Sequence, residues 1–293
     1  YALRVSRDPA LDLRQLGRRE FLVSSLLVWA TAITTFGLLV LVPLYLESVR
    51  LPYLSALETG LALVPLGVGA LAGTIGAVAL YRALGPRGVV LIGAALAMLS
   101  AWLLAQTIQP TADAGQLLAA AQSHATVPAV AGPDALRWGL LLVGLSFTFI
   151  AIPAQTLALE ALKGEALAKA SSLYITTRLI FSSIGVAIVT TLLIDRTRSR
   201  ATALVQQLQA LAPRAGSAPS DLHAAAAQRA LEGQVAAQAG AAAIQSIFWL
   251  TCVGSLGLLV VALLLPGRRR QGQDRPHPVA TAQAEAERVA IGS

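Results

Sequence analysis

The stretch at 55–81 reads SALETGLALVPLGVGALAGTIGAVALY, and its one charged side chain, Glu58, stands close to its first residue. A helix needs about 20 predominantly apolar residues to cross the hydrocarbon core of a bilayer, so this stretch is long enough to span one. Its apolar residues form a continuous run and do not alternate, and a spanning segment must satisfy its own backbone hydrogen bonds in lipid. The stretch therefore predicts a transmembrane helix.

Further apolar runs of the same character occupy much of the remaining chain. They are 21–46, 89–106, 136–160, 171–194 and 243–265. The whole sequence is 56% hydrophobic and 13% charged, and the charged share is about half that of a soluble domain. We therefore predict an all-α polytopic membrane protein with six transmembrane helices.

The net charge of +7 would also suit a nucleic-acid-binding protein. The basic residues, however, cluster at the ends of the apolar runs, where they would meet lipid headgroups, so we expect membrane lipid and no nucleic acid as their partner. Their alternation places both termini, together with the loops 82–88 and 161–170, in the cytoplasm. The loop 195–242 then lies outside, although it is rich in arginine, because long loops carry little weight in this rule.

The six runs divide into two groups of three. In chain order we expect a cytoplasmic segment at 1–20, a three-helix repeat at 21–106, an external linker at 107–135, a second three-helix repeat at 136–265 and a basic, disordered cytoplasmic tail at 266–293. The second repeat contains the external insertion 195–242, which is broken by Pro213 and Pro219 and predicts two amphipathic helical pieces on the outer surface. Two trios of opposite orientation form a 3+3 inverted-repeat bundle.

Small residues on one face of the run 55–81 predict close helix packing. Gly69 and Gly73 are four residues apart, a spacing that lets two helix backbones approach each other in lipid. Gly76 continues the same face.

Polar residues inside an apolar run are costly and mark candidate sites. They are Thr31 and Thr35 in the first run, Thr148 and Gln155 in the fourth, and Tyr174, Arg178 and Ser182 in the fifth. Each set repeats at helical spacing, so we expect these three helices to line a polar interior and a substrate cavity. For any single Ser or Thr the alternative is a hydrogen bond to the backbone of its own helix.

Arg178 is the one charged residue well inside a run, about 10 Å along a helix from Ser171. It either finds a partner in the interior or extends back to the cytoplasmic surface, and both alternatives stay open. No Asp or Glu lies in the middle of a run, and all three histidines fall in loops. The sequence therefore predicts no metal site, no cofactor and no catalytic dyad, and it disfavours an enzyme.

The loop at 81–88 reads YRALGPRG. It resembles the short cytoplasmic loop of the major facilitator superfamily, in which an Asp-Arg pair is followed by Gly and a basic residue. Arg82, Gly85 and Arg87 match that pattern, whereas Tyr81 stands at the Asp position.

Three further stretches are similar to the 14-span drug/proton antiporter branch of that superfamily. They are LDLR at 11–14, SALETGL at 55–61 followed by Pro65, and SSLYITTR at 171–178. The resemblance implies that this chain is the C-terminal half of a multidrug efflux antiporter in the bacterial inner membrane. Its partners would be protons, a small-molecule substrate and an N-terminal half that carries the proton-coupling acids.

The function implied by the resemblance is proton-driven export of small amphipathic compounds by alternating access. The alternative is a polytopic scaffold or assembly protein that transports nothing. An internal Asp or Glu in further spans upstream of Tyr1 would favour transport, and a soluble domain there would favour the scaffold.

The predicted orientation can be tested with single cysteines in a Cys252→Ser background. We expect an impermeant maleimide to label Ala225→Cys in intact cells, because 195–242 is predicted outside, and to label Ala280→Cys only after the cells are permeabilised. If only Ala280→Cys is labelled in intact cells, the orientation is the reverse of the predicted one.

Overall fold

The structure is a computed structural model that describes residues 19–49, 54–110, 113, 115–117, 133–159, 165–211 and 222–263. Its main helices are α2 (Arg19–Leu44), α3 (Ala56–Ala62), α4 (Val64–Thr107), α6 (Pro133–Leu159), α7 (Glu165–Leu211) and α8 (Leu222–Leu263), and α2 continues into a π-helical turn, η2 (Tyr45–Val49). These ranges contain no strand. Five helical stretches are long and apolar enough to cross a membrane, which confirms the prediction of an all-α membrane protein.

Several predicted segments fall mainly outside the described residues. They are the N-terminal segment 1–20, the linker 107–135 and the tail 266–293.

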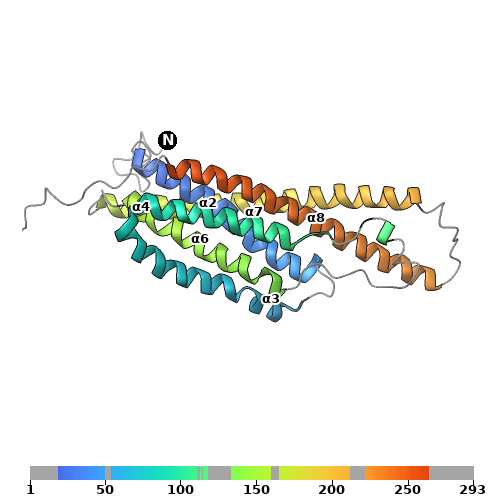
Figure 1. Ribbon diagram of the computed structural model, residues 1–293. Helices are drawn as coiled ribbons and strands as arrows, with labels where there is room; N and C mark the ends of the chain where they lie inside the picture. Colours follow the sequence, from blue (N-terminus) through green and yellow to red (C-terminus); the bar gives the residue numbers. More distant parts are fainter. Residues whose placement is uncertain are drawn as a thin grey trace, which may run out of the picture.

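One of the five stretches, Ala56–Thr107, contains two of the predicted apolar runs, and Gly85 separates them. Gly85 has φ 73° and ψ 174°, a conformation that glycine adopts without the steric penalty of a Cβ. Gly76 and Gly93 lie on opposite sides of it, and a Cβ at either would come within about 3 Å of Phe149. In a straight helix these two glycines would be about 25 Å apart. α4 therefore doubles back at Gly85, as Figure 1 shows.

The first half of α4 (64–84) packs against α6 through glycines on both helices. A Cβ at Gly69 would overlap the carbonyl oxygen of Leu141, and one at Gly73 would lie 2.9 Å from the carbonyl oxygen of Leu145. In return, a Cβ at Gly144 of α6 would overlap the carbonyl oxygen of Leu66. The two backbones are thus in direct contact, the kind of packing that small residues permit in lipid.

α2 and α7 pack in the same manner. The contacting pairs are Trp29 with Phe181, Ile33 with Gly185, and Gly37 with Val189. Both members advance by four residues from one pair to the next, so the two helices run parallel in a constant register. Gly185 brings its backbone against that of Ile33, since a Cβ there would lie 2.5 Å from the Ile33 Cα.

α7 and α8 extend beyond the other helices at one end of the bundle (Figure 1). α7 has 47 residues, about 70 Å of helix, against a hydrocarbon core of about 30 Å. Two helical pieces do occupy the described part of 195–242, and each is continuous with an apolar helix: 195–211 belongs to α7 and 222–242 belongs to α8. The segment 195–211 contains neither Pro nor Gly, so nothing in it ends the helix.

The Ala-rich start of α8 is buried earlier than the sequence predicts. Val235 and Ala239 are buried, although both lie in the predicted external insertion. Gly240 faces η2, where a Cβ would lie 2.9 Å from the Val49 Cγ1 atom. Small side chains let this part of α8 approach η2, and the buried length of α8 therefore begins before 243.

The contact between α4 and α6 leads to a prediction about stability. Gly69→Ala should lower the free energy of unfolding by about 1–3 kcal/mol, because the new methyl group meets the rigid backbone at Leu141. Gly67→Ala is the matched control on the same helix: nothing lies within 4 Å of its Cβ position, so it should leave stability unchanged or raise it by up to about 1 kcal/mol.

Denaturation of both variants by sodium dodecyl sulfate in mixed micelles, followed by far-UV circular dichroism, would measure the difference. Equal stability of the two variants would show that α4 and α6 do not approach at Gly69.

Candidate functional site

α2, α6 and α7 converge at the end of the bundle where α2 begins. Val28 of α2 belongs there to one buried cluster with Ala154 and Ala158 of α6 and with Leu173 and Tyr174 of α7. The alanines let the three helices come together. This cluster closes the space between α6 and α7 at that end.

Arg178 bridges α7 and α6 beyond this cluster. Its guanidinium carbon lies 5.3 Å from the centre of the Phe147 ring, a cation–π distance. Phe147 is seven residues before Ala154 on α6, hence about 10 Å further from the closed end. The guanidinium therefore lies within the apolar length of the bundle and does not extend back to the start of α7, which favours the interior alternative for this residue.

No hydrogen bond or ion pair joins the Arg178 guanidinium to any residue in the described part of the chain. The side chain is half-buried, and its neighbour Tyr174 is buried. A cation in this position retains its full set of N–H donors. The arrangement can therefore receive an acceptor group, and an anionic one most favourably.

A second pair of aromatic side chains lies between α2 and α7, one turn along α7 from Arg178. The rings of Trp29 and Phe181 stack with centroids 4.5 Å apart and an angle of 14° between their planes. Phe181 is three residues after Arg178, so both lie on one face of α7. The Trp29 Nε1 atom is buried and has no hydrogen-bond partner among the described residues, a state that costs about 1–3 kcal/mol.

Two further polar atoms of α2 are also buried without a hydrogen bond to a described residue. The hydroxyl oxygens of Ser24 and Ser25 are buried and have no partner among the described atoms. Ser25 is one turn before Trp29, so the side of α2 near the closed end holds several unsatisfied polar groups. Such groups call for a structural or functional reason.

Three of the predicted cavity residues bond to their own helices. The Thr31 hydroxyl donates to the Leu27 carbonyl at 2.7 Å, and the Ser182 hydroxyl donates to the Leu179 carbonyl at 2.7 Å. Thr148 donates to the carbonyl of Leu145 at 3.0 Å. These hydroxyls follow the local alternative considered for Ser and Thr, and they offer less to a ligand than their polar type suggests.

The remaining predicted residues are placed differently. Thr148 faces α4, because a Cβ at Gly73 would overlap its hydroxyl oxygen, so the structure does not bring it to Arg178. Thr35 is half-buried on α2. Gln155 is exposed and lines an open pocket of about 410 Å³ together with Ile152, Thr156 and Leu159.

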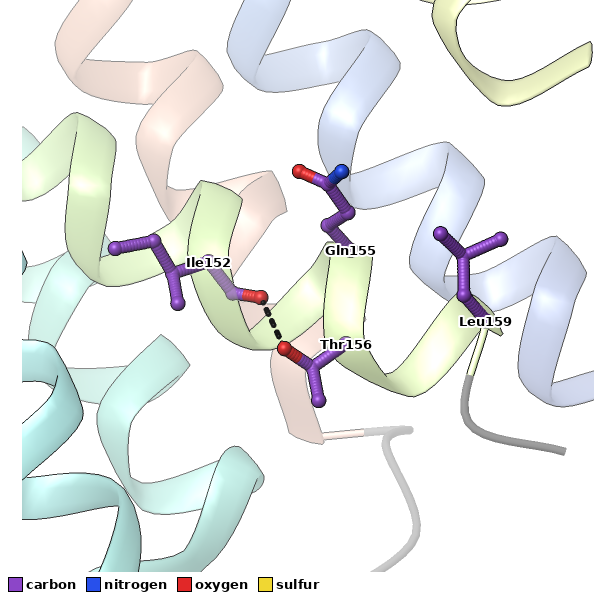
Figure 2. A pocket seen from close by; sticks show the side chains of 4 residues that line it. All are labelled: Ile152, Gln155, Thr156 and Leu159. Carbon is purple, nitrogen blue, oxygen red and sulfur yellow. Dashed lines mark hydrogen bonds between the residues drawn. The ribbon is translucent and has the colours of Figure 1, made fainter. Parts of the chain in front are cut away.

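Figure 2 shows this pocket on α6. The Thr156 hydroxyl donates to the Ile152 carbonyl at 2.9 Å, while the Gln155 amide points in another direction and is not bonded to the other residues drawn (Figure 2). The Gln155 amide therefore faces this surface without a hydrogen bond to another described residue.

The residues of the loop pattern lie where α4 doubles back. Gly85 is buried and supplies the positive φ of the bend, Arg82 is exposed and Arg87 is half-buried. The positive φ of the bend thus explains why glycine occupies this position of the pattern.

Sequence reasoning did not select Trp29, Phe147 or Phe181. Only 5% of the chain is aromatic, and the spacing of Phe181 from Arg178 was a usable signal for a ring on the same helix face. The positions of Trp29 and Phe147 depend on contacts between helices, which have no local sequence signal.

The unpaired indole predicts how Trp29 tolerates replacement. Trp29→Ala should lower the free energy of unfolding by about 3–5 kcal/mol, because it removes a packed ring. Trp29→Phe keeps a ring on Phe181 and removes the buried N–H, so its cost should stay within about 1 kcal/mol.

Trp249→Phe, at an exposed ring of α8, is the control and should change little. Unfolding in mixed micelles measures all three variants. A large loss for Trp29→Phe would mean that the indole N–H has a partner.

Neither protein-family models nor curated proteins give a match to this sequence.

Proposed function

We propose that this chain is one half of a secondary active transporter of the major facilitator type, which exports small amphipathic compounds in exchange for protons. In this proposal α4 crosses the membrane twice, and the chain forms two groups of three crossings. The first group is α2 with both halves of α4, and the second group is α6, α7 and α8.

Reciprocal packing between the two groups is the observation that carries this proposal. The first helix of each group packs against the second helix of the other: α2 lies on α7, and α6 lies on the first half of α4. Both contacts are parallel and both use glycines from each side, with Gly37 and Gly185 in one and Gly144 and Gly69 in the other. Two inverted repeats related by a pseudo-two-fold axis would produce this exchange.

The third helices of the two groups add a second argument. The Gln245 amide of α8 donates to the Ala105 carbonyl of α4 at 3.1 Å, and the Cys252 thiol lies 3.8 Å from the Met98 carbonyl oxygen. From the first contact to the second, the residue number rises by seven on α8 and falls by seven on α4. The two helices therefore run antiparallel. An antiparallel pairing of equivalent helices is what a two-fold axis between the repeats requires.

The ends of the described chain fit the same proposal. α2 begins and α8 ends at the same end of the bundle (Figure 1), as expected for an even number of crossings. With the basic segments taken into account, we propose that this end is cytoplasmic.

The surface with Arg178 and Gln155 would form one wall of the substrate cavity. No Asp or Glu lies in the middle of the apolar runs of the described helices, and Asp195 of α7 follows the run 171–194, so in this proposal the proton-coupling acids belong to the other half. Rocking of the two halves about the site would give alternating access. The closed cluster of Val28, Ala154 and Tyr174 would then separate the cavity from the cytoplasm.

The proposal is tested by measuring the rate at which cells that express the protein export a small amphipathic compound. Arg178→Ala should slow export at matched membrane expression by roughly 5- to 150-fold, the rate equivalent of about 1–3 kcal/mol for a lost charged hydrogen bond. Arg178→Lys should recover part of the rate, because an ammonium lacks the planar fork of a guanidinium.

Arg137→Ala is the matched control, since Arg137 is exposed and pairs with Asp134 at 3.3 Å on the surface of α6. The 293-residue chain alone in liposomes should show no proton flux coupled to a drug. If the unmodified protein exports nothing under a proton gradient, the scaffold alternative replaces transport. If all Arg178 variants export equally, Arg178 is not part of the cavity.

A further inference from the structure

We infer that the site around Arg178 binds an aromatic organic anion, with the anionic group at the guanidinium and the ring beside Phe147, Phe181 and Trp29. This inference names the substrate class of the proposed transporter and rests on that proposal for its role in export. The binding itself is a property of the described residues alone.

The charge of Arg178 is the first argument. The guanidinium lies in the apolar length of α7 and α6, where an uncompensated cation is unfavourable, and no described residue neutralises it. The two acids of α7 are Glu165, at its first residue, and Asp195, which lie about 20 Å and about 25 Å from Arg178 along the helix. The missing counter-charge therefore has to come from outside the described chain.

The contact with Phe147 does not supply the counter-charge that the Arg178 guanidinium lacks. A ring face attracts a cation through its quadrupole, but it offers no lone pair to the N–H groups. The guanidinium fork thus remains available to a carboxylate, a geometry that Arg matches in a bidentate manner. Phe147 holds the fork in place and reduces the entropy that a free Arg side chain would lose on binding.

The aromatic surroundings are the second, independent argument. Trp29 stacks on Phe181 one turn along α7 from Arg178, and its Nε1 donor is buried and unpaired. A flat ligand placed beside these rings gains stacking contacts. Aliphatic anions have no ring and therefore lack these stacking contacts.

The same arrangement disfavours organic cations. A ligand ammonium about 4 Å from the guanidinium would be repelled strongly in a site of low effective dielectric. No ion pair joins Arg178 to a described carboxylate that could offset this repulsion. We therefore expect selection by charge sign in addition to selection for a ring.

Three matched nitroaromatic probes test the inference, because a nitroaromatic compound quenches tryptophan fluorescence on contact. They are para-nitrobenzoate, para-nitrobenzyl alcohol and para-nitrobenzylammonium. The chain is used in zwitterionic micelles with its other three tryptophans, the exposed Trp102, Trp138 and Trp249, replaced by Phe. Trp29 is then the only tryptophan, and it is excited at a wavelength that tyrosine does not absorb. We expect saturable quenching by the anion, with a dissociation constant at least about tenfold lower than that for the alcohol, and no saturation by the ammonium.

Two variants separate the charge from the rings. Arg178→Gln should remove the preference for the anion, whereas Phe181→Leu should weaken binding of both the anion and the alcohol and leave their ratio unchanged. Arg137→Gln is the matched control for a general loss of positive charge. Far-UV circular dichroism checks that each variant is folded.

Equal affinity for the anion and the alcohol, or an unchanged preference in Arg178→Gln, would overturn the inference. A lipid headgroup is a second source of negative charge. If cyclohexanecarboxylate displaces the probe as well as unlabelled benzoate does, and phosphatidylglycerol displaces it too, the site binds headgroups and the aromatic ligand is wrong.

These measurements need no proton gradient. Anion-selective binding without export would leave the inference in place and contradict the proposed function. Export without anion-selective binding would support the proposed function and contradict the inference.

Discussion

Direct contact between helix backbones at glycines is the interaction on which the rest of this structure depends. Lipid tails are as apolar as leucine, so burial of apolar side chains does little to drive helices together, and dispersion contacts at short range have to do so. Gly69 and Gly144 bring the backbones of α4 and α6 together, and Gly185 does the same for α7 and α2, where Gly37 makes room for the Val189 side chain. A single methyl group at Gly69 or Gly144 would meet a backbone that cannot move aside.

These two contacts also decide where the polar groups lie. The register of α2 on α7 sets the Trp29 ring on Phe181, and the register of α6 on α4 turns Thr148 toward Gly73 and away from Arg178. Phe147 is next to Thr148 in sequence but on a different face of α6, and it therefore reaches the Arg178 guanidinium. Packing geometry, more than residue type, selects the members of the candidate site.

The site combines a costly cation with groups that hold it in place. Alanines at 154, 158 and 170 close one end of the space between α6 and α7, and the Phe147 ring attracts the guanidinium beyond that closure. The unpaired Trp29 Nε1 adds a donor without an acceptor. Natural proteins keep such unsatisfied groups at functional sites more readily than elsewhere, because a ligand can supply the missing partner.

Hydropathy and length predict that the chain crosses a membrane as helices, because transfer into lipid is a sum over local residues and lipid allows few backbone structures. The loop 82–88 between two apolar runs and the small-residue face of 55–81 are also predicted, since a break between apolar runs and a four-residue spacing are local patterns. The extent of α7 and α8, the burial of Val235 and Ala239, and the aromatic neighbours of Arg178 are not. Hydroxyls such as Thr31 were assigned to a cavity although they bond to their own backbone. Each of these features depends on which residues far apart in the chain meet, and that follows from the fit of helix surfaces, which no local pattern encodes.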